Sequence, residues 1–215
     1  PGQVVRSIER RAKYILVNFD NGTLIIHLGM SGRLRILTES TPPQKHDHVD
    51  ICFANGTILR YTDPRRFGCI LWTTESPFEH KLLIDLGPEP LTSAFTGKHL
   101  LQTAKNKKIP VKAFIMDAKV VVGVGNIYAC EALFAAKIDP RKPANLVSDV
   151  EYAELAKHIK RILKLAIAQG GTTLKDFYSA EGKLGYFVQK LKVYGRAKQP
   201  CVTCNAPIES LAIGQ

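Results

Sequence analysis

Several short motifs in this chain carry side chains that can bind an anion. In the turn Val122–Asn126, two glycines allow backbone amides to approach a phosphate, and the side-chain amide of Asn126 can donate one more hydrogen bond. The turn follows a lysine-rich run, as in helix–turn–helix elements that bind DNA. It predicts a phosphate contact at Asn126, and a plain helix-capping turn is the alternative interpretation.

Two further turns present groups that suit insertion into a duplex. In the DPRRFG turn, Arg65 offers a hydrogen-bonding fork and Phe67 an apolar wedge. The HLGMSG turn places Met30 between glycines as a second candidate wedge. The alternatives are that both arginines of the first turn pair with Asp63 and that Met30 belongs to the core.

Two clusters resemble metal sites. A strand over the KHDH segment would put His46 and His48 on one face, but no third ligand is near, so phosphate contact or a histidine tied to Asp47 is the better interpretation. The CVTC motif of Cys201 and Cys204 is half of a zinc site, because structural zinc needs four ligands. We therefore expect the tail from Pro200 onward to be poorly ordered.

The other three cysteines lie in apolar surroundings, where a buried free thiol is the default. They are Cys52, Cys69 and Cys130.

Composition narrows the class of protein. The 215 residues include 30 Lys and Arg against 19 Asp and Glu, which gives a net charge of +11, and 45% are hydrophobic, which excludes general disorder. Five cysteines do not suggest a secreted disulfide framework. No apolar stretch approaches the ~18 residues of a membrane span, and no signal sequence is evident. The charge favours a polyanionic partner, with a merely basic globular protein as the alternative.

Positive charge is concentrated in three segments that have almost no acidic residue. Aromatic Tyr186, Phe187 and Tyr194 lie within the last segment and offer stacking surfaces for bases. Such patches are typical of nucleic-acid binding. The segments contain Arg6, Arg10, Arg11 and Lys13; then Lys98, Lys105, Lys107, Lys108 and Lys112; then Lys183, Lys190, Lys192, Arg196 and Lys198.

Strands are expected first along the chain, joined by hairpin turns at Asn21-Gly22 and Asn55-Gly56, which favours an antiparallel sandwich or barrel. Helices follow over Ile109–Asp117, Asn126–Ala136 and from the capping box at Ser148 to Gly170. The expected strands are Lys13–Phe19, Thr23–Leu28, Val49–Phe53, Thr57–Tyr61 and Gly68–Trp72.

Together these motifs resemble the bacterial formamidopyrimidine-DNA glycosylase family, base-excision enzymes that remove oxidised purines such as 8-oxoguanine. The matching strings follow one order along the chain. They are RRAKY from Arg10, HLGMSG from His27, KHDHVD from Lys45, RYTDPRRFG from Arg60, LGPEPL from Leu86, MDAKVVVGVGNIYA from Met116, GGTTLKDF from Gly170, GYF from Gly185 and VYGR from Val193.

The resemblance implies an α+β fold with DNA in the cleft between domains. We expect a partial antiparallel β-sandwich over residues 1–76, a linker over 77–90, a helix–two-turn–helix domain over 91–180, a lesion-recognition loop and basic segment over 181–199, and a truncated zinc finger over 200–215. The implied cofactor is one structural zinc ion, for which Cys201 and Cys204 supply two of four ligands.

Residue roles follow from the same match. Met30, Arg65 and Phe67 correspond to the residues that fill the gap left by the everted nucleotide, and Arg65 also faces the orphaned cytosine. His46, Arg65 and Asn126 match phosphate or DNA contacts. Lys13 matches the lysine implicated in elimination and backbone contact.

Two features complete the implied DNA interface. Asn106 stands where the family has a DNA-contacting lysine, and we expect Lys105 or Lys107 to replace it, with Lys107 as the candidate contact. Ser179–Phe187 matches the loop that closes over the flipped base. Its candidate lesion contacts are Gly185, Tyr186 and Phe187.

The chain departs from the family at both ends. The family's nucleophile is an N-terminal proline followed by glutamate, whereas Pro1 precedes glycine and aligns inside the sandwich domain. We therefore expect Pro1 not to be the nucleophile, the chain to be truncated at both ends, and the second zinc-binding CxxC to be missing.

The resulting expectation is a base-excision repair enzyme that removes 8-oxoguanine and formamidopyrimidines from duplex DNA and cleaves the abasic strand by β,δ-elimination through a Schiff base. It would act as a cytoplasmic, nucleoid-associated monomer with damaged duplex DNA as its partner and no membrane contact. A DNA-binding remnant without glycosylase activity is the alternative. An RNA- or ribosome-associated protein fits the charge but not Met30, Arg65 and Phe67.

Overall fold

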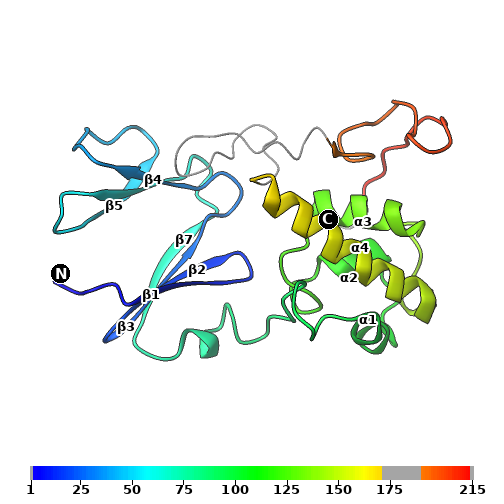
Figure 1. Cartoon of the computed structure of the whole chain (residues 1–215), viewed down its shortest axis with the longest axis horizontal. Coiled ribbons are helices and arrows are strands. Elements are labelled where there is room, and N and C mark those ends of the chain that lie inside the picture. The colour runs from blue at the N-terminus through cyan, green and yellow to red at the C-terminus, as the bar shows by residue number, and fades with distance from the viewer. Residues whose placement is uncertain (1, 171–189, 214–215) are drawn as a thin grey trace. The chain divides into compact units, whose positions relative to one another are not determined.

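The computed structural model describes residues 2–170 and 190–213. These residues divide into two compact units, the first over residues 2–84 and the second over residues 85–169 and 190–213. Strands make up the first unit and helices the second, which is the expected α+β class (Figure 1). No helix in the described part of the chain is long and apolar enough to cross a membrane.

The first unit contains two antiparallel sheets. One has the strand order β1-β2-β3-β7 and is made of Ser7–Arg11 (β1), Tyr14–Phe19 (β2), Gly22–His27 (β3) and Cys69–Thr73 (β7). The other has the order β4-β6-β5 and is made of Arg33–Leu37 (β4), Ile58–Thr62 (β6) and Asp47–Cys52 (β5).

Both expected hairpins form. Phe19 pairs with Gly22, so the first turn consists of Asp20 and Asn21, one residue earlier than expected. In the second, Gly56 adopts a left-handed conformation with φ of 83°, and the Phe53 amide donates to the Thr57 carbonyl at 2.9 Å. The sequence pattern does not predict β1 or β4, because charged side chains interrupt the apolar alternation in SIERR and RLRIL.

The second sheet contains a buried charged network. Arg60 is 2% exposed, and its guanidinium donates to both carboxylate oxygens of Asp50 at 2.7 Å and to the Thr41 carbonyl at 2.8 Å. It also lies 3.4 Å from a carboxylate oxygen of Asp47. The network ties residues 41–50, which carry His46, to the middle strand of the sheet.

The second unit is built from four α-helices with a common core. They are Gly97–Ala104 (α1), Val111–Met116 (α2), Asn126–Ala136 (α3) and Asp149–Ala168 (α4). Two short 3-10 helices, Pro77–Glu79 (η1) in the first unit and Ala144–Leu146 (η2) in the second, lie in the connections. The expected capping box of α4 is present, because the Ser148 hydroxyl and the Glu151 carboxylate each accept from the other's backbone amide.

Helix α1 is not predicted by the sequence pattern, which treats this region only as a lysine-rich run. Thr96 caps the helix by accepting from the His99 amide at 3.1 Å. Gly97 lets the helix approach α4 closely, since an added methyl group would lie 2.6 Å from the Cα of Ala153. Buried Phe95, Phe114 and Tyr152 belong to the core that the helices share.

The cysteine expectation is wrong. Cys52 is exposed, and Cys69 and Cys130 are half-buried, so none of the three is a fully buried core thiol. Cys52 lies at the end of β5, which is an edge strand with exposed residues. No further strand of the described sheet covers its outer side, so the thiol stays exposed.

Candidate functional site

The first unit presents two apolar tips on adjacent turns. Met30 is 61% exposed and Phe67 is 58% exposed, which excludes a core role for Met30. The turns approach backbone to backbone, because a methyl group on Gly29 would lie 2.6 Å from the carbonyl carbon of Phe67. Exposed large apolar side chains at turn tips suit insertion between bases.

Arg65 lies beside the second tip. Its guanidinium carbon is 4.7 Å from the centre of the Phe67 ring, a cation–π contact, and the side chain is exposed. Within the described residues, neither Arg65 nor Arg66 forms an ion pair with Asp63. The alternative in which both arginines pair with Asp63 is therefore wrong, because hydroxyl and amide donors already occupy that carboxylate.

Asp63 is fully buried beneath the two turns. Its carboxylate accepts from the hydroxyls of Ser31 at 2.7 Å and Tyr61 at 3.0 Å, and from the Gly68 amide at 2.9 Å. Burial alone would raise the pKa of Asp63, but these hydrogen bonds to the ionised form lower it to about 2. The carboxylate is therefore charged at any physiological pH.

Lys13 lies near His27 in the same unit. Desolvation of its ammonium group lowers the pKa of Lys13, although the residue as a whole is exposed. Burial, and then the charge of Lys13, lower the pKa of His27. The centre of the His27 ring lies 4.8 Å from that of the tilted Tyr14 ring, and His27 Nδ1 accepts from the Gly29 amide at 3.1 Å. The neutral ring therefore carries its proton on Nε2, a donor that sequence reasoning did not single out.

Within the described residues, neither histidine of the KHDH segment hydrogen-bonds to the Asp47 carboxylate, contrary to one of the two expected interpretations, and both histidines are linked to Asp63. His48 Nε2 donates to the Asp63 carbonyl at 2.9 Å, and the His46 carbonyl accepts from the Asp63 amide at 3.0 Å. The Asp47 carboxylate bonds instead to Thr62 and Arg35. Hydrogen bonds therefore hold His46, which is half-buried, close to the DPRRFG turn.

In the second unit, the glycine turn leads into α3 as expected, with one difference. Gly125 is the N-cap and Asn126 is the first helical residue, so Asn126 does not cap the helix. Asn126 is exposed, and its side-chain oxygen accepts from the Cys130 thiol at 3.8 Å. Its amide nitrogen is left to donate to an anion near the helix N-terminus. Lys107 lies exposed beyond the end of α1.

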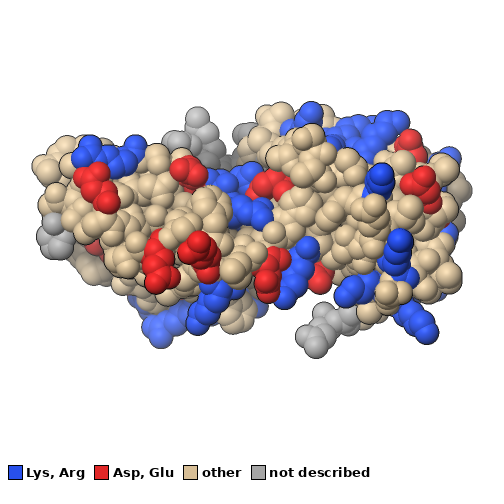
Figure 2. Space-filling model, turned by 90° about the horizontal axis from the view of Figure 1, so that it is seen from below, with Lys and Arg blue, Asp and Glu red and all other residues tan. Residues whose placement is uncertain are grey.

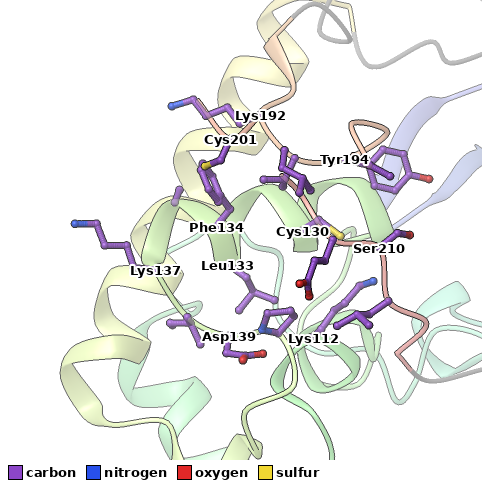
Figure 3. A pocket seen from close by; sticks show the side chains of 18 of the residues that line it. Lys112, Cys130, Leu133, Phe134, Lys137, Asp139, Lys192, Tyr194, Cys201 and Ser210 are labelled. Carbon is purple, nitrogen blue, oxygen red and sulfur yellow. The ribbon is translucent and has the colours of Figure 1, made fainter. Parts of the chain in front are cut away.

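A groove of about 970 Å³ runs between α3 and the segment 192–213. Lys112 and Cys130 lie next to one another in it (Figure 3). Lys112 is only 9% exposed. Burial raises the pKa of Cys130, and the positive charge of Lys112 opposes that shift. The sequence could have indicated that Lys112 is buried, because it is the one charged residue in the otherwise apolar run PVKAF.

Glu131 connects α3 to the same segment. Its side chain is buried, and its carboxylate accepts from the successive backbone amides of Lys192, Val193 and Tyr194 at 2.9 to 3.1 Å. Three amides directed at one anion form a nest. This carboxylate, which the sequence pattern did not single out, holds residues 192–194 against α3.

The CVTC motif forms a folded knuckle, which contradicts the expected poor order of the tail. The Cys201 amide donates to the Ala206 carbonyl at 2.8 Å, and the Lys198 amide donates to the Ile208 carbonyl at 2.8 Å. These backbone hydrogen bonds close the turn. The amides of Thr203 and Cys204 lower the pKa of the Cys201 thiol. Within residues 2–170 and 190–213, no group of three or more His, Cys, Asp or Glu side chains could hold a metal ion.

The expected lesion-loop residues Gly185, Tyr186 and Phe187 lie outside the described residues. On the face shown in Figure 2, acidic side chains lie among the lysines and arginines, so positive charge does not dominate that face.

The predicted site residues are divided between the two units. The first unit contains Met30, Arg65, Phe67, His46 and Lys13, and the second contains Lys107, Asn126, Cys201 and Cys204.

Comparison with known proteins links both units to one family. The model described as "Formamidopyrimidine-DNA glycosylase N-terminal domain" matches residues 1–70, and the model "Formamidopyrimidine-DNA glycosylase H2TH domain" matches residues 86–178. The chain is 56% identical over 214 residues to the formamidopyrimidine-DNA glycosylases of Pseudomonas aeruginosa (strain LESB58) and Vibrio atlanticus (strain LGP32). Each match covers 100% of this chain and 79% of the relative.

Solved structures of the same family resemble this chain over nearly its whole length. The MutM (Fpg) protein from Thermus thermophilus superposes with a TM-score of 0.90 at 34% identity, covering 99% of this chain and 79% of that one. Lactococcus lactis Fpg in complex with DNA containing an abasic site superposes with a TM-score of 0.91 at 33% identity, covering 99% of this chain and 78% of that one. The sandwich and helix–two-turn–helix architecture expected from the sequence is thereby confirmed.

Proposed function

Because this chain belongs to the formamidopyrimidine-DNA glycosylase family, it is a base-excision repair glycosylase and AP lyase by family, and we propose that Met30, Arg65 and Phe67 form the wedge with which it opens damaged duplex DNA. The observation that carries the proposal is the exposure of Met30 and Phe67 at the tips of two touching turns.

The wedge offsets the cost of exposing the damaged nucleotide. Turning a base out of the stack costs roughly a few kcal/mol. Apolar Met30 and Phe67 can occupy the space the nucleotide leaves, and the guanidinium of Arg65 can hydrogen-bond to the base left without a partner. The stacking of Arg65 on Phe67 keeps the two groups together before DNA arrives.

Elimination requires a group that removes a proton from the sugar while the strand breaks. We assign this role to Lys13, because desolvation lowers its pKa and so increases the fraction of neutral amine near pH 7. His27, with its Nε2 proton directed away from the Gly29 amide, lies near Lys13 and can donate to a phosphate beside the reacting sugar.

Sequence-independent contacts position the duplex. We assign His46 on the first unit, and Asn126 and Lys107 on the second, as contacts to phosphates or the DNA backbone. Asn126 is supported by its exposed amide at the N-terminus of α3. Residues 91–180 are proposed as the DNA-binding helical domain, in keeping with the family-model match over residues 86–178.

We assign Cys201 and Cys204 as two ligands of the structural zinc ion that the family implies. The fit is that of half a site, since the two thiols share one knuckle and the lowered pKa of Cys201 favours the thiolate that binds zinc. The ion would brace the knuckle, whose backbone hydrogen bonds already close the turn.

The replacement Phe67→Ala tests the proposed function. We expect roughly 10- to 100-fold weaker binding to a duplex with 8-oxoguanine opposite cytosine, because the vacated space is no longer filled. Fluorescence anisotropy of a labelled duplex measures the dissociation constant.

Phe78→Ala is the matched control, since Phe78 is 50% exposed in the same unit but lies in η1, away from the two tips. Its affinity should stay within about twofold of wild type. Equal losses in the two variants would contradict the wedge.

Asn126→Ala tests the proposed phosphate contact. We expect damaged and undamaged duplexes to bind about 3- to 10-fold more weakly, because one hydrogen bond to a phosphate is lost and phosphates carry no information about the base. Anisotropy titrations with the two duplexes measure both constants. Asn145→Ala, at another exposed asparagine of this unit, is the control. A loss confined to the 8-oxoguanine duplex would exclude the phosphate role.

A further inference from the structure

One buried carboxylate holds the two turns that carry the wedge. Asp63 Oδ1 accepts from the Ser31 hydroxyl at 2.7 Å and from the Arg65 amide at 3.3 Å. Asp63 Oδ2 accepts from the Gly68 amide at 2.9 Å and from the Tyr61 hydroxyl at 3.0 Å. Ser31 follows Met30 directly, while Arg65 and Gly68 enclose Phe67. The carboxylate therefore bonds to the turn of each apolar tip.

The backbone supports the same link. Gly29 has φ of 63°, a conformation that favours glycine, and a methyl group there would lie 2.6 Å from both the Phe67 carbonyl carbon and the Gly68 nitrogen. Arg66 also adopts a left-handed conformation, with φ of 55°, and its amide donates to the Asp63 carbonyl at 3.3 Å. The turns thus contact each other through backbone atoms as well as through Asp63.

A fixed arrangement matters because exposed tips otherwise lose freedom when they enter DNA. Ordering a flexible side chain on binding costs roughly 0.5–1.5 kcal/mol, and ordering backbone adds to it. Two tips held in one geometry have lost most of that freedom before binding. Insertion of one tip then also places the other.

We propose that Asp63 is a positioning residue that joins the Met30 and Phe67 turns into one rigid wedge, so that both side chains enter the duplex together. Asp63 itself does not touch DNA, being fully buried. The inference rests on the proposed wedge function and adds the residue that holds the two tips in one geometry.

Asp63→Ala is the sharper test, because an asparagine could still link the two turns. With its NH₂ group in place of Oδ1, Asp63→Asn could donate to the Ser31 hydroxyl, and its oxygen could accept from Gly68 and Tyr61. The Arg65 amide would keep the Ser31 hydroxyl, at 3.2 Å, as its acceptor. Asp63→Ala instead removes the oxygens that both turns share.

The readout is a double-mutant cycle on insertion. 2-Aminopurine beside 8-oxoguanine in a duplex brightens when its neighbour leaves the stack, and titration with the full chain gives the equilibrium constant for insertion. In the wild-type background, Met30→Ala and Phe67→Ala should be coupled by roughly three- to tenfold, because insertion of one tip also places the other. In the Asp63→Ala background the coupling should fall below about twofold, and insertion should fall about tenfold while affinity for undamaged duplex changes less than about twofold.

Ser31→Ala removes the hydroxyl through which the Met30 turn bonds to both Asp63 and the Arg65 amide. It should weaken the coupling in the same way, so it serves if Asp63→Ala does not fold. Tyr61→Phe removes a hydrogen bond to Asp63 that reaches neither tip, and it should keep the wild-type coupling. Undiminished coupling in Asp63→Ala, or in Ser31→Ala where that variant stands in, overturns the positioning role and leaves the wedge intact. No fluorescence rise with the wild-type chain overturns the wedge and, with it, this inference.

Discussion

Glu131→Ala is expected to detach the segment that begins at Lys192 from α3, at a cost of about 3 kcal/mol. The carboxylate accepts from three successive amides at 2.9 to 3.1 Å, and removing it leaves those amides without an acceptor in a partly buried place. Hydrogen exchange at the amides of residues 192–194, followed by NMR or mass spectrometry, should accelerate by roughly 100-fold, in line with that free energy.

Two further variants serve as comparisons: one removes only the charge of Glu131, and the other removes an exposed glutamate elsewhere. Glu131→Gln keeps one oxygen for the amides and should accelerate exchange less than Glu131→Ala does. Glu154→Ala removes an exposed glutamate of α4 that forms a surface ion pair with Lys157, and it should leave exchange at residues 192–194 unchanged. Exchange in Glu131→Ala as slow as in wild type would show that other contacts hold the segment.

Elements with strong local signals are predictable from this sequence. Helix α3 has the expected bounds, Asn126–Ala136, because a glycine turn precedes it and most of its residues are apolar. The capping box at Ser148 places the start of α4. Helix α1 and strand β4 lack such signals, since α1 depends on close packing at Gly97 and β4 on pairing with β6. Tertiary contact, which no local pattern encodes, decides those elements.

The partners of buried charges are harder to predict. Asp63 lies two positions from Arg65, the obvious ion pair, yet its shortest hydrogen bond goes to Ser31, 32 positions away. Asp47 stands between two histidines and bonds to Arg35 and Thr62. The sequence identifies Asp63 and Asp47 as charged residues within motifs. Their hydrogen-bond partners depend on how the β-strands pair, which the sequence does not show.

The tips themselves are the part of the site best predicted from sequence. Glycines around Met30 and the proline of the DPRRFG turn restrict these residues to turns, and turn tips are exposed. These turn residues therefore favour exposure of Met30 and Phe67, although the sequence also allowed a core position for Met30, which its 61% exposure excludes. The positioning residues beneath them, Asp63 and Ser31, depend on how the turns meet.

Arg60→Met is expected to lower the free energy of unfolding of the first unit by about 3 kcal/mol, because it removes the positive charge that neutralises the buried Asp47 carboxylate and the partly buried Asp50 carboxylate. Arg60 bridges Asp50, Asp47 and the Thr41 carbonyl while only 2% exposed. Urea unfolding of the full chain, followed by fluorescence of Trp72 in β7, measures the loss. Arg6→Met is the control, since the ion pair of Arg6 with Asp20 is exposed and worth at most about 1 kcal/mol.

The pH dependence of that loss separates charge from packing. Burial alone would raise the pKa of Asp47, but hydrogen bonds from Thr62, Gln44 and Arg35 lower it to about 2. The hydrogen bond from Arg60 lowers the pKa of Asp50. An unfolded aspartate titrates near 3.9, so the stability due to each lowered pKa is complete above about pH 5 and is lost as the pH falls from there through the folded pKa. Without Arg60 the contribution of Asp50 is absent, so the difference between Arg60→Met and wild type should shrink from pH 6 to pH 3. A difference of equal size at both values would mean that Arg60 stabilises the sheet by packing alone.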